Sequence, residues 1–368
     1  MRRLVPLVGV TVVLGSLTLV ALQSLPADER SRRDAAARPR ALPTPPADGE
    51  ALRLVRRAAA APATVAYAGT QYLAAWESGH TTSHLLKVTH SPATGTTWRA
   101  TGTAASPGHQ VHQPPDSVLP SVVGVGEVAL LTRHYALTAG GSGEVAGRAA
   151  EIVEARRPAG ATGAGSVAAR FWLDRETGLL LRREVYDRTG RVIRASAYVD
   201  LSVRPASDPP RADGRDDDGA WRDALDASAV RRLRDHGWSC PASLPGPLPL
   251  VDARRGGRSG DIVQFSYADG IASVSVFQQR GRLDPAALDG FRSASRNGRD
   301  VWVRPGVPRR VVWSDGGTVF TVVADAPRRT VDRAVDALHA AAPRGGGNTV
   351  DRLGRGLNRV ASWFNPFE

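Results

Sequence analysis

Residues 171–190 read FWLDRETGLLLRREVYDRTG, and the phrase Asp-Arg-(Glu)-Thr-Gly occurs in them twice, at Asp174–Gly178 and at Asp187–Gly190. From Ile193 to Leu201 every second residue is apolar, which is the period of a half-buried strand. In each repeated phrase the Asp can accept hydrogen bonds within a turn, and the Gly can adopt a positive φ. We therefore predict an antiparallel meander with strands at about 170–174, 179–186 and 191–201.

The two Asp residues of the repeat have a second interpretation, because paired carboxylates perform general acid and base chemistry. A catalytic pair must converge on one pocket, whereas equivalent positions in successive turns lie at opposite ends of a strand. We therefore interpret Asp174 and Asp187 as turn formers and assign no catalytic residue.

The composition is that of a globular protein with a strong arginine bias. The chain has 368 residues, of which 42% are hydrophobic and 23% charged, so it is long enough for two domains with cores. The formal net charge is +12, and Lys87 is the only lysine. A basic chain can be attracted to acidic lipid, wall polymer or an acidic partner. No recognition motif supports nucleic-acid binding, and we expect none.

Signatures of catalysis and of metal binding are missing from the sequence. Cys240 is the only cysteine, so neither an internal disulfide nor a multi-cysteine metal site can form. His109 and His112 are three residues apart, but no third ligand accompanies them. The chain has no G-x-S-x-G elbow, no Walker loop and no H-E-x-x-H motif. We therefore expect no metal, no cofactor and no enzymatic activity.

The N-terminal segment 1–26 contains an uncharged apolar run, Leu4–Leu25. At about 1.5 Å per residue it can cross a bilayer core of about 30 Å. A cleavage site needs small residues at its minus-three and minus-one positions, and such a pair is hard to find here, so we favour an uncleaved signal anchor over a cleaved signal peptide. The arginines of the Pro/Ala/Arg-rich tether at 27–49 outnumber Arg2 and Arg3, which by itself would place the body in the cytoplasm.

Composition shifts divide the remainder of the chain. Pro, Gly and Asp accumulate around a linker at 205–220, which separates a first domain at 50–204 from a second at 221–342. The tail at 343–368 carries apolar residues at helical spacing with arginines between them. It predicts a basic amphipathic helix that lies on a membrane surface, on a partner or on the protein's own body.

Periodicity and turn residues predict an α+β fold in both domains. In the first domain we expect a helix at 51–61, followed by strands at 64–77, 82–91, 95–103, 128–138 and 145–156. In the second we expect helices at 228–236, at 284–296 and from Thr330, a hairpin at 261–278 around Asp269-Gly270, and strands at 299–304 and 309–314.

Large apolar residues that share a strand face by the two-residue period suggest where a ligand binds. Tyr72 and Trp76 share one face of their strand, and Phe171 and Leu173 share a face of another. If the strands curl into a partly open barrel, these faces could line an apolar cavity, where an acyl chain gains about 0.8 kcal/mol per CH₂. Alternatively, these residues fill the core.

Several motifs in one order resemble a known family. FWLDRETGLLLRREVYDRTGRVIRASAYVDL, preceded by Glu144–Arg148 and followed by YADGIASVSVFQQ and TVFTVVADAPRRTVDRAVDAL, is similar to the RseB/MucB family of sigma-E regulatory proteins in an actinobacterial version. The resemblance covers about residues 51–340. It implies a first domain like the lipoprotein carriers LolA and LolB, an antiparallel sheet curled around helices, followed by a smaller α+β domain.

The resemblance also implies a function outside the cytoplasmic membrane, despite the arginine-rich tether. Proteins of this family bind the exported part of a membrane-anchored anti-sigma factor of the RseA type and shield it from proteolysis. Lipid or a lipoprotein acyl chain releases that grip. We expect the lipid near Tyr72, Trp76, Phe171 and Leu173. We expect the anti-sigma factor near Phe265, Tyr267 and Phe277. The alternatives are a lipid or lipoprotein carrier without a regulatory role and a hydrolase with an unrecognised site, and the natural ligand stays open.

Overall fold

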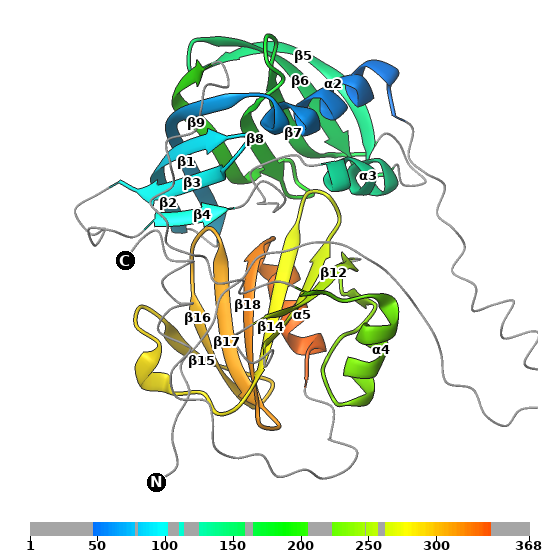
Figure 1. Ribbon diagram of the computed structural model, residues 1–368, viewed down its shortest axis with the longest axis vertical. Helices are drawn as coiled ribbons and strands as arrows, with labels where there is room; N and C mark the ends of the chain where they lie inside the picture. The colour runs from blue at the N-terminus through cyan, green and yellow to red at the C-terminus, as the bar shows by residue number, and fades with distance from the viewer. Residues whose placement is uncertain are drawn as a thin grey trace, which may run out of the picture.

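The computed structural model describes residues 47–77, 80–101, 110–113, 125–158, 165–204, 223–246, 248–256 and 262–339. These residues form two antiparallel sheets of nine strands each, with few helices. Figure 1 shows the first sheet curled above the second, with α2 and α3 beside the first and α4 and α5 beside the second. This arrangement confirms the α+β fold class.

The first sheet has the strand order β4-β3-β2-β1-β9-β8-β7-β6-β5, so the first and last strands of this half pair at its centre. β4 and β5 end the order at opposite edges, and the sheet is therefore open rather than a closed barrel. The strands are β1 (Ala66–Glu77), β2 (His80–Ser91), β3 (Gly95–Ala100), β4 (Gln110–Gln113), β5 (Ala136–Val145), β6 (Arg148–Arg156), β7 (Val167–Asp174), β8 (Leu180–Tyr186) and β9 (Val192–Arg204).

The meander predicted from the repeated phrase is confirmed as β7, β8 and β9. Gly178 and Gly190 have φ values of +83° and +81°, as the turns require. Asp174 accepts hydrogen bonds from the backbone N and the hydroxyl of Thr177, at 2.8 and 2.5 Å. Asp187 accepts from Thr189 N at 2.8 Å. Both carboxylates serve the turns in which they lie.

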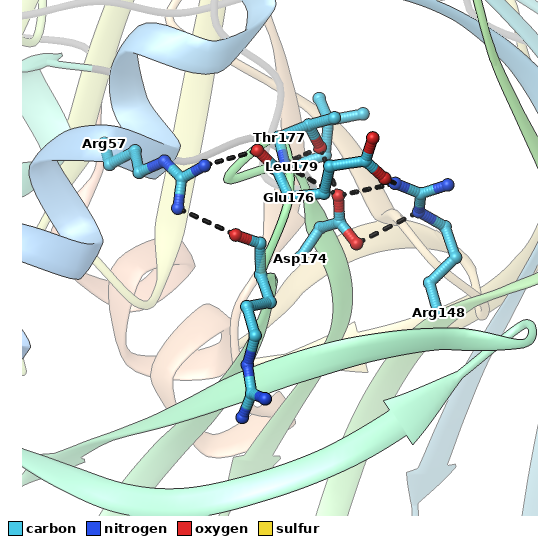
Figure 2. A network of polar contacts seen from close by, with 7 residues as sticks. Arg57, Arg148, Asp174, Glu176, Thr177 and Leu179 are labelled. Carbon is cyan, nitrogen blue, oxygen red and sulfur yellow. Dashed lines mark hydrogen bonds and ion pairs between the residues drawn. The ribbon is translucent and has the colours of Figure 1, made fainter.

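The Asp174 turn also anchors neighbouring elements (Figure 2). Arg148 at the start of β6 donates to both carboxylate oxygens of Asp174, at 3.0 and 2.9 Å. Arg57 on α2 donates to the backbone carbonyls of residues 175 and 176. Burial by itself would raise the pKa of Asp174, but the hydrogen bonds from Arg148 and Thr177 outweigh it and hold that pKa below its ordinary value.

Two helices pack on the first sheet, α2 (Gly49–Ala60) and α3 (Val125–His134), and a 3₁₀ turn η1 (Ala61–Ala63) follows α2. The side chain of Asp48 caps α2 by accepting from Glu50 N at 2.9 Å. The inward stripe of α2 joins Phe171 and Leu173 in one buried apolar cluster. The predicted strand at 128–138 is wrong over most of its length, because α3 runs to His134 and β5 begins only at Ala136. A short apolar run such as 128–131 does not distinguish a buried helix from a strand.

The second sheet has the order β10-β12-β13-β14-β18-β17-β16-β15, with β11 paired to β12. Its strands are β10 (Asp223–Ala224), β11 (Ser243–Leu244), β12 (Leu248–Gly256), β13 (Ile262–Ala268), β14 (Ser273–Arg280), β15 (Arg292–Arg296), β16 (Arg299–Arg304), β17 (Arg309–Asp315) and β18 (Thr318–Asp325). The helices are α4 (Ala227–Asp235) and α5 (Arg328–Ala337), with a 3₁₀ turn η2 (Pro285–Ala287).

The core of the second half lies between its sheet and the helices α4 and α5. Trp313 and Phe320 stack with ring centroids 4.9 Å apart, and both are fully buried. The hydroxyl of Tyr267 donates to the carbonyl of Pro241 at 3.1 Å, which satisfies the polar end of a buried phenol.

Two expectations for the second half have different outcomes. The hairpin around Asp269-Gly270 is confirmed as β13 and β14, with a loop of residues 269–272. The helix predicted at 284–296 is wrong. Asp284 caps a helical turn as predicted, but only η2 forms, and Arg292–Arg296 pairs with β16 as a strand. Gly290, with φ at +71°, breaks any continuation between them.

The predicted N-terminal anchor, the 205–220 linker and the 343–368 tail lie outside the described residues. Within the ranges given above, no helix is long and apolar enough to cross a membrane.

Candidate functional site at the junction of the two sheets

The tip of the β13–β14 hairpin, residues 269–272, enters the apolar core of the first sheet. Ile271 is 7% exposed and belongs to the same buried cluster as residues of α2, α3 and β7. A second contact joins Leu130 of α3 to Val251 of β12 and Ala268 of β13. Figure 1 shows this hairpin rising toward the first sheet beside α3. The two halves of the described chain therefore share a hydrophobic contact.

The shape of the tip is set by Asp269 and Gly270. One carboxylate oxygen of Asp269 accepts from Ile271 N and Ala272 N, at 2.9 and 2.7 Å. Gly270 has φ at +93°, and a Cβ placed on it would lie 2.7 Å from the backbone N of Leu131. Only glycine fits this close approach to α3.

Tyr135, which follows α3, completes the contact with the tip. Its hydroxyl donates to the other carboxylate oxygen of Asp269 at 2.7 Å. Burial, together with the charge of Asp269, raises the pKa of Tyr135. The phenol therefore stays protonated and remains a donor.

A buried cluster of charges lies beside the tip. Asp325 at the end of β18 accepts from Arg183 of β8 at 2.9 Å and from Arg194 of β9 at 2.5 Å. Arg183 also donates to the carbonyl of Ile271, and Arg194 donates to the carbonyl of Ala326 at 2.6 Å. Burial would raise the pKa of Asp325, but the two guanidinium groups outweigh it and lower that pKa. The carboxylate is thus ionised and fully paired.

A second ion pair crosses the junction with the opposite arrangement of charge. Glu77, at the end of β1, lies 2.5 Å from Arg309 of β17 and 3.6 Å from Arg194. Burial lowers the pKa of Arg309, and the charge of Glu77 opposes that effect. Each half therefore contributes an acid to the other half's arginine. The pair is largely buried, so removing one partner would leave the other charge poorly compensated and destabilise the junction.

The acidic side chains of the junction are paired within the protein. The junction carboxylates of Asp325 and Glu77 are both held by arginine. Across the part of the chain that the structure describes, no three His, Cys, Asp or Glu side chains gather as metal ligands. At the junction, Ile271 packs in a buried apolar cluster, and the paired guanidinium groups of Arg183 and Arg194 lie beside it.

The structure divides the four residues predicted to bind lipid into two pairs. Tyr72 lies opposite Leu85 on the face of β1 that also carries Trp76, and Trp76 is 38% exposed. Phe171 lies opposite Arg183, which lies opposite Ser196, which in turn lies opposite Leu73. Directly opposed residues of an antiparallel sheet share a face, and Leu73 is next to Tyr72 on β1, so this row lies on the other face of the sheet from Tyr72. Phe171 and Leu173 are thus buried near the tip, on the opposite face from Tyr72 and Trp76. The lipid role of the four stays a prediction.

The three residues predicted to contact the anti-sigma factor lie inside the second half. Phe265 and Tyr267 are fully buried in its main core, and Phe277 is 1% exposed. Phe277 lies opposite Gln264 on β13, and so on the other face of the sheet from Phe265. A partner role for these residues stays a prediction, and the hairpin they belong to is the one that forms the junction.

Apart from the turn residues Asp269 and Gly270, the sequence does not single out the residues that build the junction. Arg183 interrupts the apolar positions Leu181 and Val185 on an inward face of β8, and this was the available signal for a buried charge. Ile271 directly follows the turn residues Asp269-Gly270, where an exposed polar residue would be usual. Neither signal identifies the partner across the junction.

Part of the first half of the chain matches a known family model. Residues 109–217 match the model of the MucB/RseB N-terminal domain, which confirms the resemblance. The matched segment includes the meander and both Arg183 and Arg194. A search of curated proteins finds no match.

Solved structures show loose overall likenesses. The MucA/MucB complex of Pseudomonas aeruginosa is matched at 19% identity and a TM-score of 0.41, over 81% of this chain and 100% of that one. A structure of MucB is matched at 18% identity and a TM-score of 0.47, over 80% and 99% of the two chains. A LolA superfamily protein from Nitrosomonas europaea is matched at 9% identity and a TM-score of 0.18, over 75% and 91%.

Proposed function

We propose that this chain is a non-enzymatic, extracytoplasmic regulator of an ECF sigma factor pathway. It binds the exported part of a membrane-anchored anti-sigma factor and protects that segment from proteolysis. The observation that carries the proposal is the match of residues 109–217 to the MucB/RseB N-terminal domain. MucB itself is known in complex with MucA, and we infer a corresponding partner for this chain.

Lipid or a lipoprotein acyl chain acts in this proposal as the releasing ligand. A ligand can shift the protein away from its partner only if it binds better to the released state than to the bound one. The chain is stationed at the cell membrane by Leu4–Leu25 and the tether that follows. Its basic net charge favours a membrane with acidic lipids.

The test is capture of the tagged full-length chain from native membranes, with analysis of both proteins and lipids. We expect recovery of a membrane protein with one span together with its sigma factor. The exported segment of that protein, mixed with this chain, should be cleaved more slowly by the protease that makes the first cut in it. Recovery of no anti-sigma factor, or equal cleavage with and without this chain, would contradict the proposal.

A lipid or lipoprotein carrier without a regulatory role is the second candidate. The open antiparallel sheet with helices on one side favours it, because such a sheet can enclose an apolar guest. Capture of lipid without any protein partner would support the carrier over the regulator.

A further inference from the structure

We propose that one outer face of the first sheet docks on the surface of a bilayer that contains anionic lipids. This docking face is formed by the outward side chains of β2, β1 and β9, on the opposite side of the sheet from Phe171 and the helices that pack on it. Docking there leaves α2 and α3 on the side away from the bilayer. The proposal goes beyond the proposed function and takes from it only the presence of a nearby membrane.

The large hydrophobic side chains that are exposed gather on the docking face. Within the described residues they are Trp76, Leu85 and Val199, with exposed fractions of 38, 43 and 59%. Leu85 lies opposite Tyr72 on β1, and Trp76 shares that face by the two-residue period. Tyr198 is buried in the inner core, so its neighbour Val199 points outward. Single exposed apolar residues are ordinary, whereas a cluster on adjacent strands marks an interaction surface.

A row of directly opposed residues shows that the outer face changes its chemistry at β9. The row runs from β6 to β2 through Glu154, Arg170, Glu184, Ala195, Ala74 and Ser83. On β6–β8 its charges are paired, since Arg170 lies 2.7 Å from Glu154 and Arg182 contacts Glu184. From β9 to β2 the row is uncharged, and Trp76 and Leu85 flank it. The ion-paired half of this face suits water, and the uncharged half suits an apolar surface.

The aromatic residues of the docking face suit the boundary between water and a bilayer. Tyr72 and Trp76 carry rings with an apolar body and a polar group, and such rings concentrate at the level of the lipid head groups. Leu85 and Val199 have no polar group and can insert beyond that level. A peripheral membrane site combines these two kinds of side chain with positive charge.

The charges that border the patch favour anionic lipid. Lys87 is exposed on the docking face, opposite Thr70, and Arg204 is exposed on the same face at the end of β9. One acid, Asp200, lies opposite Thr70 from the other side, and its carboxylate accepts from Thr70 N at 3.2 Å. These three charges sum to a positive border, which attracts lipid phosphate at about 1 kcal/mol per basic residue near the surface.

The chain that precedes the described residues is long enough for this face to reach a bilayer. In the proposed function Leu4–Leu25 lies in the membrane, and residues 26–48 connect it to α2. An extended stretch of that length reaches about 75 Å, whereas a sheet of nine strands is about 40 Å wide. The connection therefore permits either face to dock, and the composition of the docking face selects this one.

The experiment places a fluorescent label in the middle of the docking face of the full chain. Ser83→Cys keeps every apolar residue of the patch, and the native Cys240 is buried, so a thiol-reactive NBD dye labels the new cysteine. With vesicles of equal parts phosphatidylcholine and phosphatidylglycerol, the emission should shift to the blue and be quenched by nitroxide lipid. The matched control is Ala60→Cys on the exposed side of α2, whose label should show neither change. Equal quenching at both positions, or none at Ser83→Cys, would overturn the proposal.

Further variants in the Ser83→Cys background test the chemistry of docking. Leu85→Ser should lower the ratio of docked to undocked chain by about tenfold. Lys87→Gln should lower it about fivefold, which corresponds to ~1 kcal/mol, and should remove part of the preference for phosphatidylglycerol over pure phosphatidylcholine. Arg56→Gln removes an exposed positive charge from α2 instead and should leave the ratio unchanged. Equal effects of Lys87→Gln and Arg56→Gln would contradict a specific basic border.

Two other outcomes are separated by the same label. A blue shift that grows with protein concentration in the absence of vesicles would assign the face to a second copy of the chain and overturn membrane docking. The label reports contact of the face whether or not Leu4–Leu25 crosses the bilayer, and no anti-sigma factor is present. Docking can therefore fail while capture of an anti-sigma factor succeeds, and the reverse result is equally distinguishable.

Discussion

The β7–β8 turn and the β13–β14 tip are built from the same local chemistry and have different surroundings. In each, an Asp side chain accepts backbone N–H groups and a Gly takes a positive φ. The first turn stays within its own half and is bonded there by Arg57 and Arg148. The second enters the other half, where it meets Leu131, Tyr135 and Arg183. The comparison teaches that turn chemistry fixes the shape of a loop, whereas its role depends on what the loop contacts.

The largest expected effect comes from removing the acid that holds two arginines at the junction. Asp325→Asn removes the carboxylate that both Arg183 and Arg194 contact, and leaves Arg194 the more distant Glu77 at 3.6 Å, so it should lower the free energy of unfolding by about 3–5 kcal/mol. Urea denaturation followed by tryptophan fluorescence and circular dichroism measures the loss. The matched control is Asp300→Asn, an exposed position on β16, where a change within about 0.5 kcal/mol is expected. A comparably small change for Asp325→Asn would mean that the junction does not stabilise the protein.

Three glycines with similar φ sharpen the comparison of the two loops. Gly190→Ala meets no atom within 4 Å, so it should cost only the backbone strain of about 1–2 kcal/mol. Gly178→Ala meets the Cγ of Arg57 at 2.9 Å and the backbone carbonyl oxygen of Arg57 at 3.3 Å, so it should cost more than Gly190→Ala. Gly270→Ala meets the backbone N of Leu131 at 2.7 Å, and should add about 1–3 kcal/mol of overpacking. Equal losses of unfolding free energy for all three variants, measured by thermal unfolding, would show that the tip does not pack closely against α3.

Two deletions of side-chain hydrogen bonds, two bonds for Arg57 and one for Tyr135, separate the roles of the loops at lower cost. Arg57→Ala and Tyr135→Phe each remove bonds that tie a turn to a helix, and each should lower stability by about 1 kcal/mol. The two variants should speed hydrogen exchange at different backbone amides. Arg57→Ala should speed exchange at Gly178, whose N–H is bonded within the turn, and Tyr135→Phe at Ile271 and Ala272. Faster exchange at both loops in either variant would contradict their independence.

The same comparison explains what the sequence could predict. The meander and the hairpin followed from Asp and Gly at fixed spacing, because those signals are local. The prediction of a helix at 284–296 was wrong although its cap was correct. Gly290 has a positive φ, and residues 292–296 pair with β16 as a strand. The junction could not be predicted, since Arg183 and Asp325 are 142 residues apart and neither position has a motif. A buried arginine signals that a partner exists without identifying it.

The smallest expected effect is a dependence of the junction on mild acid. A Cβ atom at Gly306, between β16 and β17, would lie 3.8 Å from Nε2 of His84 on β2. Burial lowers the pKa of His84, and the charges of Arg310 and Arg304 lower it further. The unfolded histidine, with a pKa near 6.5, therefore binds protons at higher pH than the folded one does. Stability falls as pH drops below about 6.5, because protons then favour the unfolded state. His84→Gln should reduce the loss of unfolding free energy between about pH 7 and pH 5. His90 and His134 also have lowered pKa values and account for part of the remainder. An identical pH profile for His84→Gln and the unaltered chain would show that His84 does not carry this effect.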